Sequence, residues 1–283
     1  MPGANLQKTL ISKKPKTVVI YPRPNDASND TFAATAVKYL RGDLPGIETV
    51  KELRHDSGSL KKGKINGRTC FFKELKPRNR RDVAKAALGI RPLSRALRIF
   101  CGERILARHG LQAPAFCFAI EKRFAWFSLS SVHVSEAVAA ISINAWCRQF
   151  SMDDPGIAPK KRRLVVQLAV EAARLHKNHI YHGEMNLNNI LCRENPDGSF
   201  CLYWIDNERT RKYKFFPYGR MVKNLHQLNR NPGCFTLHDR LRFFIIYCQH
   251  MGIYGGNRRK FLHMMEKRFD KSRSTEQKGQ TIR

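Results

Sequence analysis

Residues 181–191 read YHGEMNLNNIL, and residues 204–209 read WIDNER. The first segment contains Glu184 and Asn189, and the second contains Asp206. Phosphoryl transfer uses such a set, because one group orients the attacking hydroxyl and two oxygen ligands hold magnesium on the nucleotide phosphates. We therefore predict that Glu184 orients or deprotonates an acceptor hydroxyl and that Asn189 and Asp206 bind magnesium. The alternative is that these polar groups only cap a helix end.

The composition indicates the broad class of the protein. The 283 residues, 42% of them hydrophobic, can form one bilobal domain or two small ones. Lys and Arg number 52 against 23 Asp and Glu, so the net charge is +29. Such a charge favours polyanionic partners, which include nucleic acid, anionic lipid headgroups and acidic glycans. No stretch approaches the roughly 20 apolar residues of a membrane span, and residues 1–16 lack the apolar core of a secretory signal.

Eight cysteines are scattered along the chain without a C-x-x-C pair. Most of them lie in apolar runs, such as the run Ile99-Phe100-Cys101. We therefore expect buried, reduced thiols of a cytosolic protein rather than a zinc site, whose ligands usually come in close pairs.

The first half of the chain has the pattern of a small antiparallel sheet with one helix. Residues 1–45 are rich in polar residues and Pro, and they are expected to form a weakly structured extension. Residues 46–130 form the predicted first lobe, in which the Asn-Gly pair at 66–67 indicates a hairpin. A helix is predicted from Ser94, a suitable N-cap, to Gly110, a suitable stop. The other predicted strands are 70–75, 115–120 and 125–129, with a turn at 121–123 between the last two.

The second half of the chain is mainly helical in its pattern. Residues 160–176 carry apolar side chains at helical spacing, and helical patterns recur at 238–250 and 258–269. The segment 189–206 is predicted to form a hairpin. At its centre, NPDG places Pro and Gly where a type I turn favours them.

The order of these features is that of the protein-kinase-like fold. A glycine-bearing turn, a strand Lys, a helix Glu and further strands precede a long helix, a His-x-carboxylate loop ending in Asn, and a strand ending in Asp. We therefore predict an α+β, bilobal protein-kinase-like fold, with a small N-lobe of antiparallel sheet plus one helix and a larger, mainly helical C-lobe. The C-lobe is predicted at residues 131–270, and a polar, disordered tail at 271–283.

Four residues of the first lobe are candidates for nucleotide binding. Lys73, on a predicted strand, would hold the α- and β-phosphates of ATP, and Glu103 in the predicted helix would pair with Lys73. Gly58 and Ser59 lie about fifteen residues before Lys73, where a phosphate-covering loop is expected. The alternatives are a solvated lysine, a surface ion pair of Glu103 with Arg104 or Arg108, and a plain hairpin turn at 56–59.

The two opening segments carry a resemblance to a known family. HGEMNLNNIL at 182–191, together with IDNER at 205–209, resembles the lipopolysaccharide kinases that phosphorylate Kdo or heptose in the inner core. Lys73 with the preceding Phe, the helix with Glu103, and LQAP at 111–114 are similar to the same family. The resemblance extends over roughly residues 47–250 of the chain.

Three features favour a small-molecule or glycan kinase over a protein kinase. Gly183 stands in place of the Arg with which protein kinases contact a phosphorylated activation loop, and the I-D-x-x-R pattern differs from D-F-G. No A-P-E segment or long activation loop follows Asp206. His182 is expected to brace the loop through backbone hydrogen bonds rather than to act in catalysis.

The resemblance implies ATP and Mg²⁺ as cofactors and an acceptor hydroxyl on a lipid-linked core sugar. It implies a cytoplasmic protein in peripheral contact with the cytoplasmic face of the inner membrane of a Gram-negative bacterium. The family's roles fall on Lys73, Glu103, Asn189 and Asp206. Glu184 stands where the family usually has Asp, and its extra methylene moves the carboxylate by roughly 1 Å.

An anionic glycolipid, the lipopolysaccharide core, is the expected partner of the basic surface. Arg209, Arg211 and Lys212 are predicted to bind it, because they follow the strand that ends at Asp206; a solvated basic surface is the alternative. Two other functions are open: a kinase-like pseudoenzyme or binding protein for an anionic glycolipid without turnover, and a nucleic-acid-binding protein. Charge alone suggests nucleic acid, and no basic aromatic motif or zinc finger supports it. The sequence specifies neither the acceptor hydroxyl nor the oligomeric state.

Overall fold

The computed structural model describes residues 9–13, 16–22, 29–53, 57–77, 79–90, 93–124, 127–150, 156–230 and 232–280. The chain divides into two compact units, and the division falls within one helix. The first unit consists of Met1–Gly102 and Pro114–Val138, and the second of Glu103–Ala113 and Ala139–Arg283. Among the described residues we find no helix with the length and apolar character that crossing a bilayer requires.

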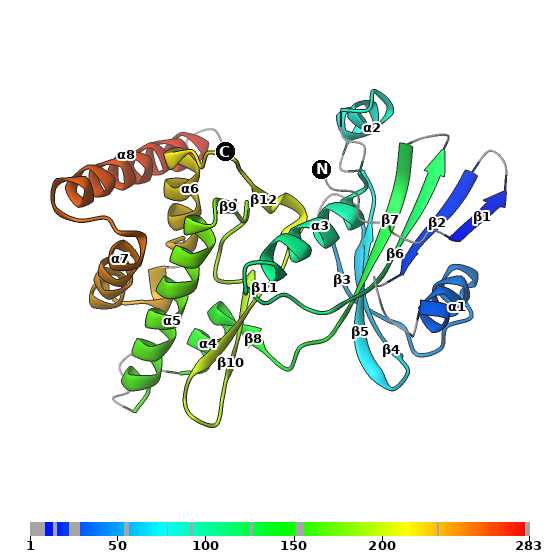
Figure 1. Cartoon of the computed structure of the whole chain (residues 1–283), viewed down its shortest axis with the longest axis horizontal. Coiled ribbons are helices and arrows are strands. Elements are labelled where there is room, and N and C mark those ends of the chain that lie inside the picture. The colour runs from blue at the N-terminus through cyan, green and yellow to red at the C-terminus, as the bar shows by residue number, and fades with distance from the viewer. Residues whose placement is uncertain are drawn as a thin grey trace. The chain divides into compact units, whose positions relative to one another are not determined.

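The first unit contains a seven-stranded sheet in the order β1-β2-β6-β7-β5-β4-β3, and every neighbouring pair is antiparallel (Figure 1). Three helices of the described residues accompany the sheet, two more than the single helix that was predicted. The strands are β1 (Thr9–Lys13), β2 (Lys16–Pro22), β3 (Glu48–Glu52), β4 (Ser59–Ile65), β5 (Arg68–Leu75), β6 (Phe116–Phe124) and β7 (Phe127–Glu136). The helices are α1 (Asn29–Arg41), α2 (Arg80–Ala87) and α3 (Arg95–Ala107).

The two faces of this sheet bury different helices. One face, the α1 face, includes Phe72 of β5 and packs in one cluster with Phe32 and Ala36 of α1. The other face, the α3 face, includes Leu75 of β5 and packs with the first turns of α3, including Phe100. Successive strand residues point to opposite faces, so β5 supplies apolar side chains to both clusters. The central part of the sheet is therefore covered on both sides.

Two local predictions in this unit are confirmed. Asn66 and Gly67 join β4 to β5 with φ of 51° and 76°, as a two-residue hairpin with positive φ at both central residues requires. Ser94 precedes α3, and its Oγ accepts a hydrogen bond from the backbone N–H of Leu97 at 3.2 Å, which satisfies one of the free N–H groups at the helix start. Gly110 follows the helix with φ of 68°.

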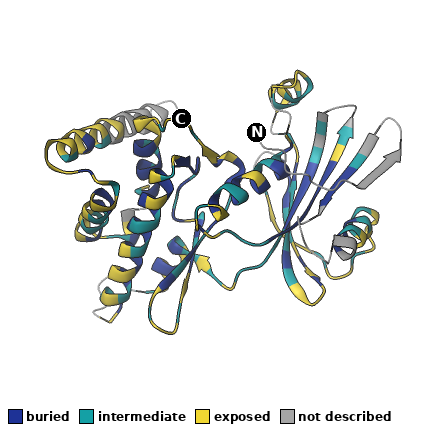
Figure 2. Ribbon diagram, viewed as in Figure 1, coloured by how far each residue is buried: buried dark blue, intermediate teal, exposed yellow. Residues whose placement is uncertain are grey.

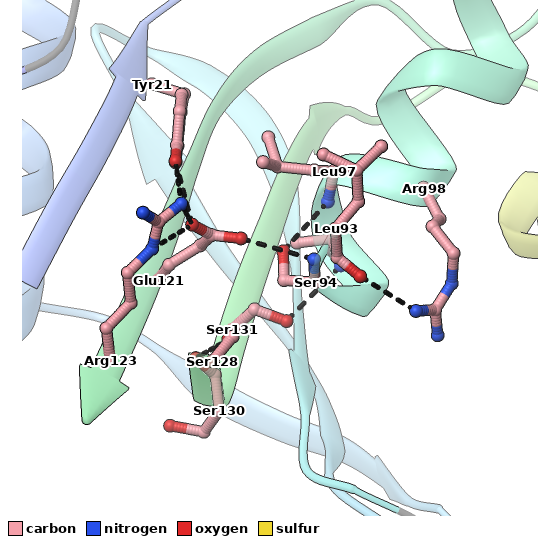
Figure 3. A network of polar contacts seen from close by, with 11 residues as sticks. Tyr21, Leu93, Ser94, Leu97, Arg98, Glu121, Arg123, Ser128, Ser130 and Ser131 are labelled. Carbon is pink, nitrogen blue, oxygen red and sulfur yellow. Dashed lines mark hydrogen bonds and ion pairs between the residues drawn. The ribbon is translucent and has the colours of Figure 1, made fainter. Parts of the chain in front are cut away.

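The turn predicted at residues 121–123 is wrong, because all three residues lie within β6. Glu121 is fully buried, and its carboxylate accepts hydrogen bonds from the Tyr21 hydroxyl at 2.8 Å and from the Arg123 guanidinium (Figure 3). The same carboxylate accepts a hydrogen bond at 3.3 Å from the backbone N–H of Ser94, at the start of α3. A carboxylate is favourable at a helix N-terminus, so Glu121 joins the sheet to α3. The polar sequence at residues 121–123 therefore marks a buried carboxylate with hydrogen-bond partners rather than a turn.

Residues 1–45 also differ from the expected weakly structured extension. They include β1 and β2, and they include α1, whose Phe32 and Ala36 belong to the core of the first unit. β2 pairs with β6 along seven residues, from Lys16 to Pro22. The short apolar run of β2 is stable because long-range pairing supplies the partners that its own sequence lacks. The predicted strand 125–129 corresponds to the longer β7.

The second unit is mainly helical. Its central helix is α5 (Ala158–Lys177), which buries one side along its length (Figure 2). Its other helices are α4 (Ile143–Arg148), α6 (Tyr218–Leu228), α7 (Leu237–Met251) and α8 (Gly255–Gln280), and its strands are β8 (Ile141–Ser142), β9 (Ile180–Tyr181), β10 (Ile190–Glu194), β11 (Phe200–Trp204) and β12 (Arg211–Lys212). β10 and β11 form the predicted hairpin, and the N–H of Gly198 donates to the carbonyl of Asn195 at 2.9 Å in its turn.

The helices predicted at 160–176, 238–250 and 258–269 are confirmed as α5, α7 and α8. The backbone of α8 continues to Gln280, which contradicts the predicted disorder of 271–280; residues 281–283 lie outside the described residues. The helix α6 was not predicted, although its apolar residues recur at helical spacing after Pro217. Six cysteines are buried as expected, whereas Cys101 is exposed and Cys201 is partly exposed.

Candidate functional site

The loop from β9 to β10 begins with a tight approach at Gly183. Its φ is +87°, a conformation that side-chain-bearing residues rarely adopt. A Cβ atom at this position would lie 2.4 Å from the Cβ of Arg209 and 3.1 Å from the Arg209 carbonyl oxygen. The loop therefore has room only for glycine at position 183. The Arg that protein kinases have at this position would not fit.

The backbone carbonyl of Glu184 organises the rest of the loop. It accepts hydrogen bonds from the Asn186 N–H at 2.9 Å and from the Nδ2 of Asn189 at 3.0 Å. The Asn189 carboxamide uses its donor side in this contact, so its Oδ1 is oriented away from Glu184 and has the chemistry of a magnesium ligand. The Asn189 N–H donates to the Asn186 carbonyl at 2.9 Å, which completes a compact turn.

Asp206 lies where β11 ends. In the hairpin, Ile190 is opposite Trp204, and the N–H of Ile205 donates to the carbonyl of Asn189 at 3.0 Å. Asn189 and Asp206 therefore lie at the same open end of the hairpin. Asp206 has φ of 60° and ψ of 46°, a left-handed conformation. Such backbone strain is concentrated at functional sites, where the surrounding structure holds it in place.

The carboxylate of Glu184 forms an ion pair with Arg209, with 3.2 Å between Oε1 and Nη1. The side chain of Glu184 is 29% exposed and that of Arg209 is 51% exposed. The structure thus brings a predicted catalytic residue and a predicted substrate-binding residue into direct contact. An exposed pair of this kind stabilises the fold by about 0–1 kcal/mol, so its main effect is to orient the two side chains.

His182 is fully buried beneath the loop and is suited to bracing it. Burial lowers the pKa of its imidazole to about 4, although the Asp206 carboxylate and nearby polar atoms favour the protonated form. The ring is therefore neutral near pH 7, and it packs 5.4 Å from the ring of Trp204. Its backbone N–H donates to the Oδ1 of Asn224 at 3.3 Å, and its carbonyl accepts from the Thr210 hydroxyl at 3.3 Å.

Two residues of α6 support the loop, and neither was predicted from the sequence. Asn224 is fully buried and binds the backbone of His182, as described above. Gln227 donates from Nε2 to the Gly183 carbonyl at 3.0 Å, and its Oε1 accepts from the Met185 N–H at 3.3 Å and from Asn224 Nδ2 at 3.1 Å. Their role has one signal in the sequence, a pair of carboxamides three residues apart on an amphipathic helix.

A basic surface adjoins this loop within the second unit. Arg211 and Lys212 form β12, which pairs with β9, and both side chains are exposed. The Nζ of Lys212 donates to the Nε2 of His109 at 2.8 Å. Two further cations lie over the ring of Tyr181, namely Arg220 at 5.0 Å and Lys223 at 5.9 Å from its centroid. Neither Arg220 nor Lys223 was predicted to contribute to this surface, because α6 itself was not predicted.

The predicted nucleotide residues of the first unit lie in and beside β4 and β5. Lys73 is partly buried and is opposite His133 of β7, on the α3 face of the sheet. The Gly58 Cβ position would overlap the Glu74 carbonyl at 1.9 Å, so glycine is required there by the approach of β5. Ser59 is 4% exposed, and its hydroxyl donates to Glu74 at 2.7 Å. Asp56 of the predicted turn lies outside the described residues.

Glu103 lies on α3 and is only 7% exposed. It is spaced four residues after Ile99 and three after Phe100, which are buried on the α3 face. A carboxylate this buried needs a charged or hydrogen-bonding partner. The pairing of Glu103 with Lys73 stays a prediction.

Comparisons with known proteins give a family match and a structural match for this chain. The model of the lipopolysaccharide kinase (Kdo/WaaP) family matches residues 55–247. Among solved structures 1145 chains match, and one of them is described as "WaaP in complex with acyl carrier protein". That chain is 19% identical with a TM-score of 0.62, and the match covers 89% of this chain and 98% of that one, which establishes a shared kinase-like fold. Comparison with curated protein sequences gives no match.

Proposed function

The chain belongs to the lipopolysaccharide kinase (Kdo/WaaP) family, and from this we propose that it transfers the γ-phosphoryl group of ATP to a sugar hydroxyl, of Kdo or heptose, in the lipopolysaccharide inner core. One observation carries the proposal beyond family membership. The Nδ2 of Asn189 is bound to the Glu184 carbonyl, so Asn189 Oδ1 and the Asp206 carboxylate supply two oxygen groups at one end of the β10–β11 hairpin.

Asn189 and Asp206 would hold Mg²⁺ in the proposed reaction. Carboxylate and carboxamide oxygens are the ligands that Mg²⁺ prefers, and it usually takes only one or two from the protein, with the rest from phosphates and water. Magnesium, when bound, neutralises charge on the β- and γ-phosphates. The task of the chain's own residues is then to fix the position of this group and to orient the acceptor.

Glu184 would orient the acceptor hydroxyl and accept its proton. In phosphoryl transfer this residue contributes mainly by positioning, so a glutamate can serve where aspartate is usual, provided that its carboxylate is held in place. Arg209 supplies such a hold, because its guanidinium binds Glu184 at 3.2 Å. Gly183 permits the close approach of Arg209 that this contact needs.

Lys73 would bind the α- and β-phosphates, and Glu103 would align it. Gly58 would present its backbone N–H near the phosphates. Ser59 is less suited to a side-chain contact, because its hydroxyl is committed to Glu74. Any phosphate contact at Ser59 would therefore come from its backbone.

The acceptor would be held by the basic surface beside the loop. Arg209, Arg211 and Lys212 provide cations that suit the anionic groups of a glycolipid core. Arg220 and Lys223 extend this surface on the side of α6. A positive surface of this kind would also draw the protein into peripheral contact with an anionic membrane.

The test is transfer of radioactive phosphate from ATP to core lipopolysaccharide that has been stripped of phosphate. Asp206→Asn is expected to lose at least about a hundredfold in rate, because a charged ligand that acts on the transferring group is removed. Asp197→Asn is the matched control, since Asp197 is fully exposed in the turn at the other end of the same hairpin. Normal turnover by Asp206→Asn would refute the assignment of the metal ligand, and mass spectrometry of the product would identify the phosphorylated sugar.

A kinase-like binding protein without turnover is the second candidate. The observation that favours it is the engagement of the Glu184 carboxylate by Arg209, which competes with its role toward an acceptor hydroxyl. Under this hypothesis the wild type binds the anionic glycolipid yet transfers no phosphate, and Glu184→Asp is needed to create activity. Measurable transfer by the wild type excludes this candidate.

A further inference from the structure

A cavity of about 440 Å³ lies on the α1 face of the sheet in the first unit. Its apolar lining includes Leu40 of α1, Ile120 of β6 and Val132 of β7. The volume falls in the range of roughly 300–1,000 Å³ that is typical of small-molecule sites. We call this cavity the α1 cavity. Strand alternation places the side chain of Lys73, the candidate nucleotide-binding residue, on the opposite, α3 face of the sheet, so Lys73 does not line the α1 cavity.

One wall of the α1 cavity is a preorganised polar cluster around Glu74 of β5. Its carboxylate accepts hydrogen bonds from the Tyr39 hydroxyl, from the Ser59 hydroxyl at 2.7 Å and from the Lys61 ammonium at 2.9 Å. Burial alone would raise the pKa of Glu74, but these three donors outweigh it and lower the pKa. The negative charge of Glu74 is therefore present and already satisfied, and it leaves little tendency to attract a further cation.

Beside the Glu74 cluster, on the same face of the sheet, is a row of three further lining residues from three adjacent chain segments. Lys122 of β6 is opposite Ser130 of β7, and Lys76 follows directly after Leu75, which is opposite Ser131. Lys76, Ser130 and Lys122 therefore lie side by side on the α1 face, and all three line the cavity. Both lysines are exposed, and no ion pair among the described residues involves either of them.

The charges of the α1 cavity are unbalanced. Lys61, Lys76 and Lys122 face a single carboxylate, Glu74, which Lys61 already neutralises. Two ammonium groups flanking one hydroxyl provide the donors that a phosphate group uses. The apolar lining offers contact to the less polar part of the same ligand.

We propose that the α1 cavity binds a small phosphate-bearing molecule, with its phosphate at Lys76, Ser130 and Lys122 and its less polar part against Leu40 and Val132. This site is distinct from the phosphoryl-transfer site and does not depend on that proposal. The phosphate group is the shared chemistry of two sources, a soluble phosphorylated sugar and a phospholipid headgroup. Separate probes distinguish them.

The test uses the full, unmodified chain, and titration calorimetry measures its affinity for each probe. The soluble probes are glucose 6-phosphate and inorganic phosphate, with glucose as the uncharged control, and the lipid probe is a vesicle of phosphatidylcholine containing phosphatidylglycerol. Lys76→Glu and Lys122→Glu are each expected to weaken binding of the phosphate-bearing probe by at least about tenfold, because a charge-assisted hydrogen bond becomes a repulsion. Ser130→Trp is expected to abolish binding by filling the cavity without a change in charge.

Lys64→Glu is the matched charge control. Lys64 is an exposed residue of β4 near the Asn66-Gly67 turn, and it does not line the α1 cavity. Binding that falls equally in Lys64→Glu would overturn the proposal, because net charge alone would then explain it. So would the absence of binding by every phosphate-bearing probe, or competition between the probe and ATP. Circular dichroism of each variant confirms that lost binding is not lost folding.

Discussion

Asn189 donates a hydrogen bond from its Nδ2 to the backbone carbonyl oxygen of Glu184, at 3.0 Å. The carbonyl of Asn189 in turn accepts a hydrogen bond at 3.0 Å from the N–H of Ile205, which directly precedes Asp206. A single residue thus ties the loop that carries Glu184 to the hairpin end that carries Asp206. In the proposed reaction Asn189 would therefore have two separable roles, as a hydrogen-bond donor that fixes the loop and as an oxygen ligand.

Substitution of Asn189 separates these roles. Asn189→Ala removes both, and we expect kcat to fall about a hundredfold, the scale of a misplaced reacting group. Asn189→Asp restores a ligand oxygen but sets a carboxylate against the Glu184 carbonyl, so its rate should be intermediate with a changed magnesium dependence. Initial rates over a series of magnesium concentrations measure both effects. Asn195→Ala, in the exposed hairpin turn, is the control, and an Asn189→Ala enzyme as fast as this control would disprove the assignment.

Gly183→Ala is expected to destabilise the fold strongly. The substitution places a Cβ at positive φ, which costs about 1–2 kcal/mol, and it forces that Cβ to within 2.4 Å of Arg209 Cβ. Overpacking of this kind adds about 1–3 kcal/mol. The free energy of unfolding in urea should therefore fall by roughly 2–5 kcal/mol.

A second glycine at positive φ isolates the effect of the close approach. Gly198 has φ of +76°, and its nearest neighbour is the flexible end of the Arg163 side chain at 3.2 Å. Gly198→Ala should therefore show only the conformational cost. Arg209→Gly should recover part of the stability lost in Gly183→Ala, because it removes the Cβ that is contacted. Equal destabilisation by the two alanine substitutions would show that the Arg209 contact is unimportant.

The ion pair between Glu184 and Arg209 is expected to matter for activity rather than for stability. Arg209→Ala should change the free energy of unfolding by less than about 1 kcal/mol, because both side chains are partly exposed. Its phosphotransfer rate should nevertheless fall, since Glu184 loses its orienting partner. Lys160→Ala breaks a comparable pair, with Glu194 at 3.1 Å, away from the loop and should leave the rate unchanged. A large stability loss in Arg209→Ala alone would contradict this separation.

The stability of the protein is expected to fall as the pH is lowered through the range 6.5 to 4. Burial lowers the pKa of both His176 and His182 to about 4, whereas an unfolded histidine has a pKa of about 6.5. Between these values the unfolded chain binds protons that the folded chain does not, so the stabilisation is complete above about pH 6.5 and decreases below it. Each histidine contributes a slope of about 1.4 kcal/mol per pH unit.

Urea unfolding at pH 7 and at pH 5 measures this dependence. The free energy of unfolding should be lower at pH 5 by roughly 4 kcal/mol from the two histidines together. His182→Gln should reduce the difference, because one buried titrating group is removed. His263→Gln is the control, since the side chain of His263 is 64% exposed. A pH difference that is the same in both variants would exclude His182 as its source.

The candidate site was largely predictable because its parts are close in the sequence. Glu184, Asn189 and Asp206 lie on one loop and one hairpin, and the turn residues at 195–198 specify that hairpin locally. The helix α3 was predictable from its N-cap and its glycine stop. The helices α5 and α7 were predictable because the period of their apolar residues reports burial without any knowledge of the partner. Local pattern and turn chemistry therefore determined the fold class and the identity of the central polar residues.

Polar residues with distant partners were not predictable in this way. Glu121 reads as part of a polar turn, yet Tyr21, a hundred residues earlier, makes it a buried strand residue. Asn224 and Gln227 lie in a segment for which no element was predicted, yet they hold the backbone of the loop at His182 and Gly183. A polar side chain can be buried only where another segment satisfies its hydrogen bonds, and no short stretch of sequence contains that second segment.

The sequence by itself determined the kinase-like order of elements and the set formed by Glu184, Asn189 and Asp206. The tertiary structure alone decided that Gly183 must be glycine, because the clashing atoms belong to Arg209. It alone decided that Ser59 is committed to Glu74 and that strands β5, β6 and β7 meet α1 around a cavity. The physical reason is the same in each case: periodicity and turn preferences act over a few residues, whereas steric contact and hydrogen-bond pairing act between segments that only folding brings together.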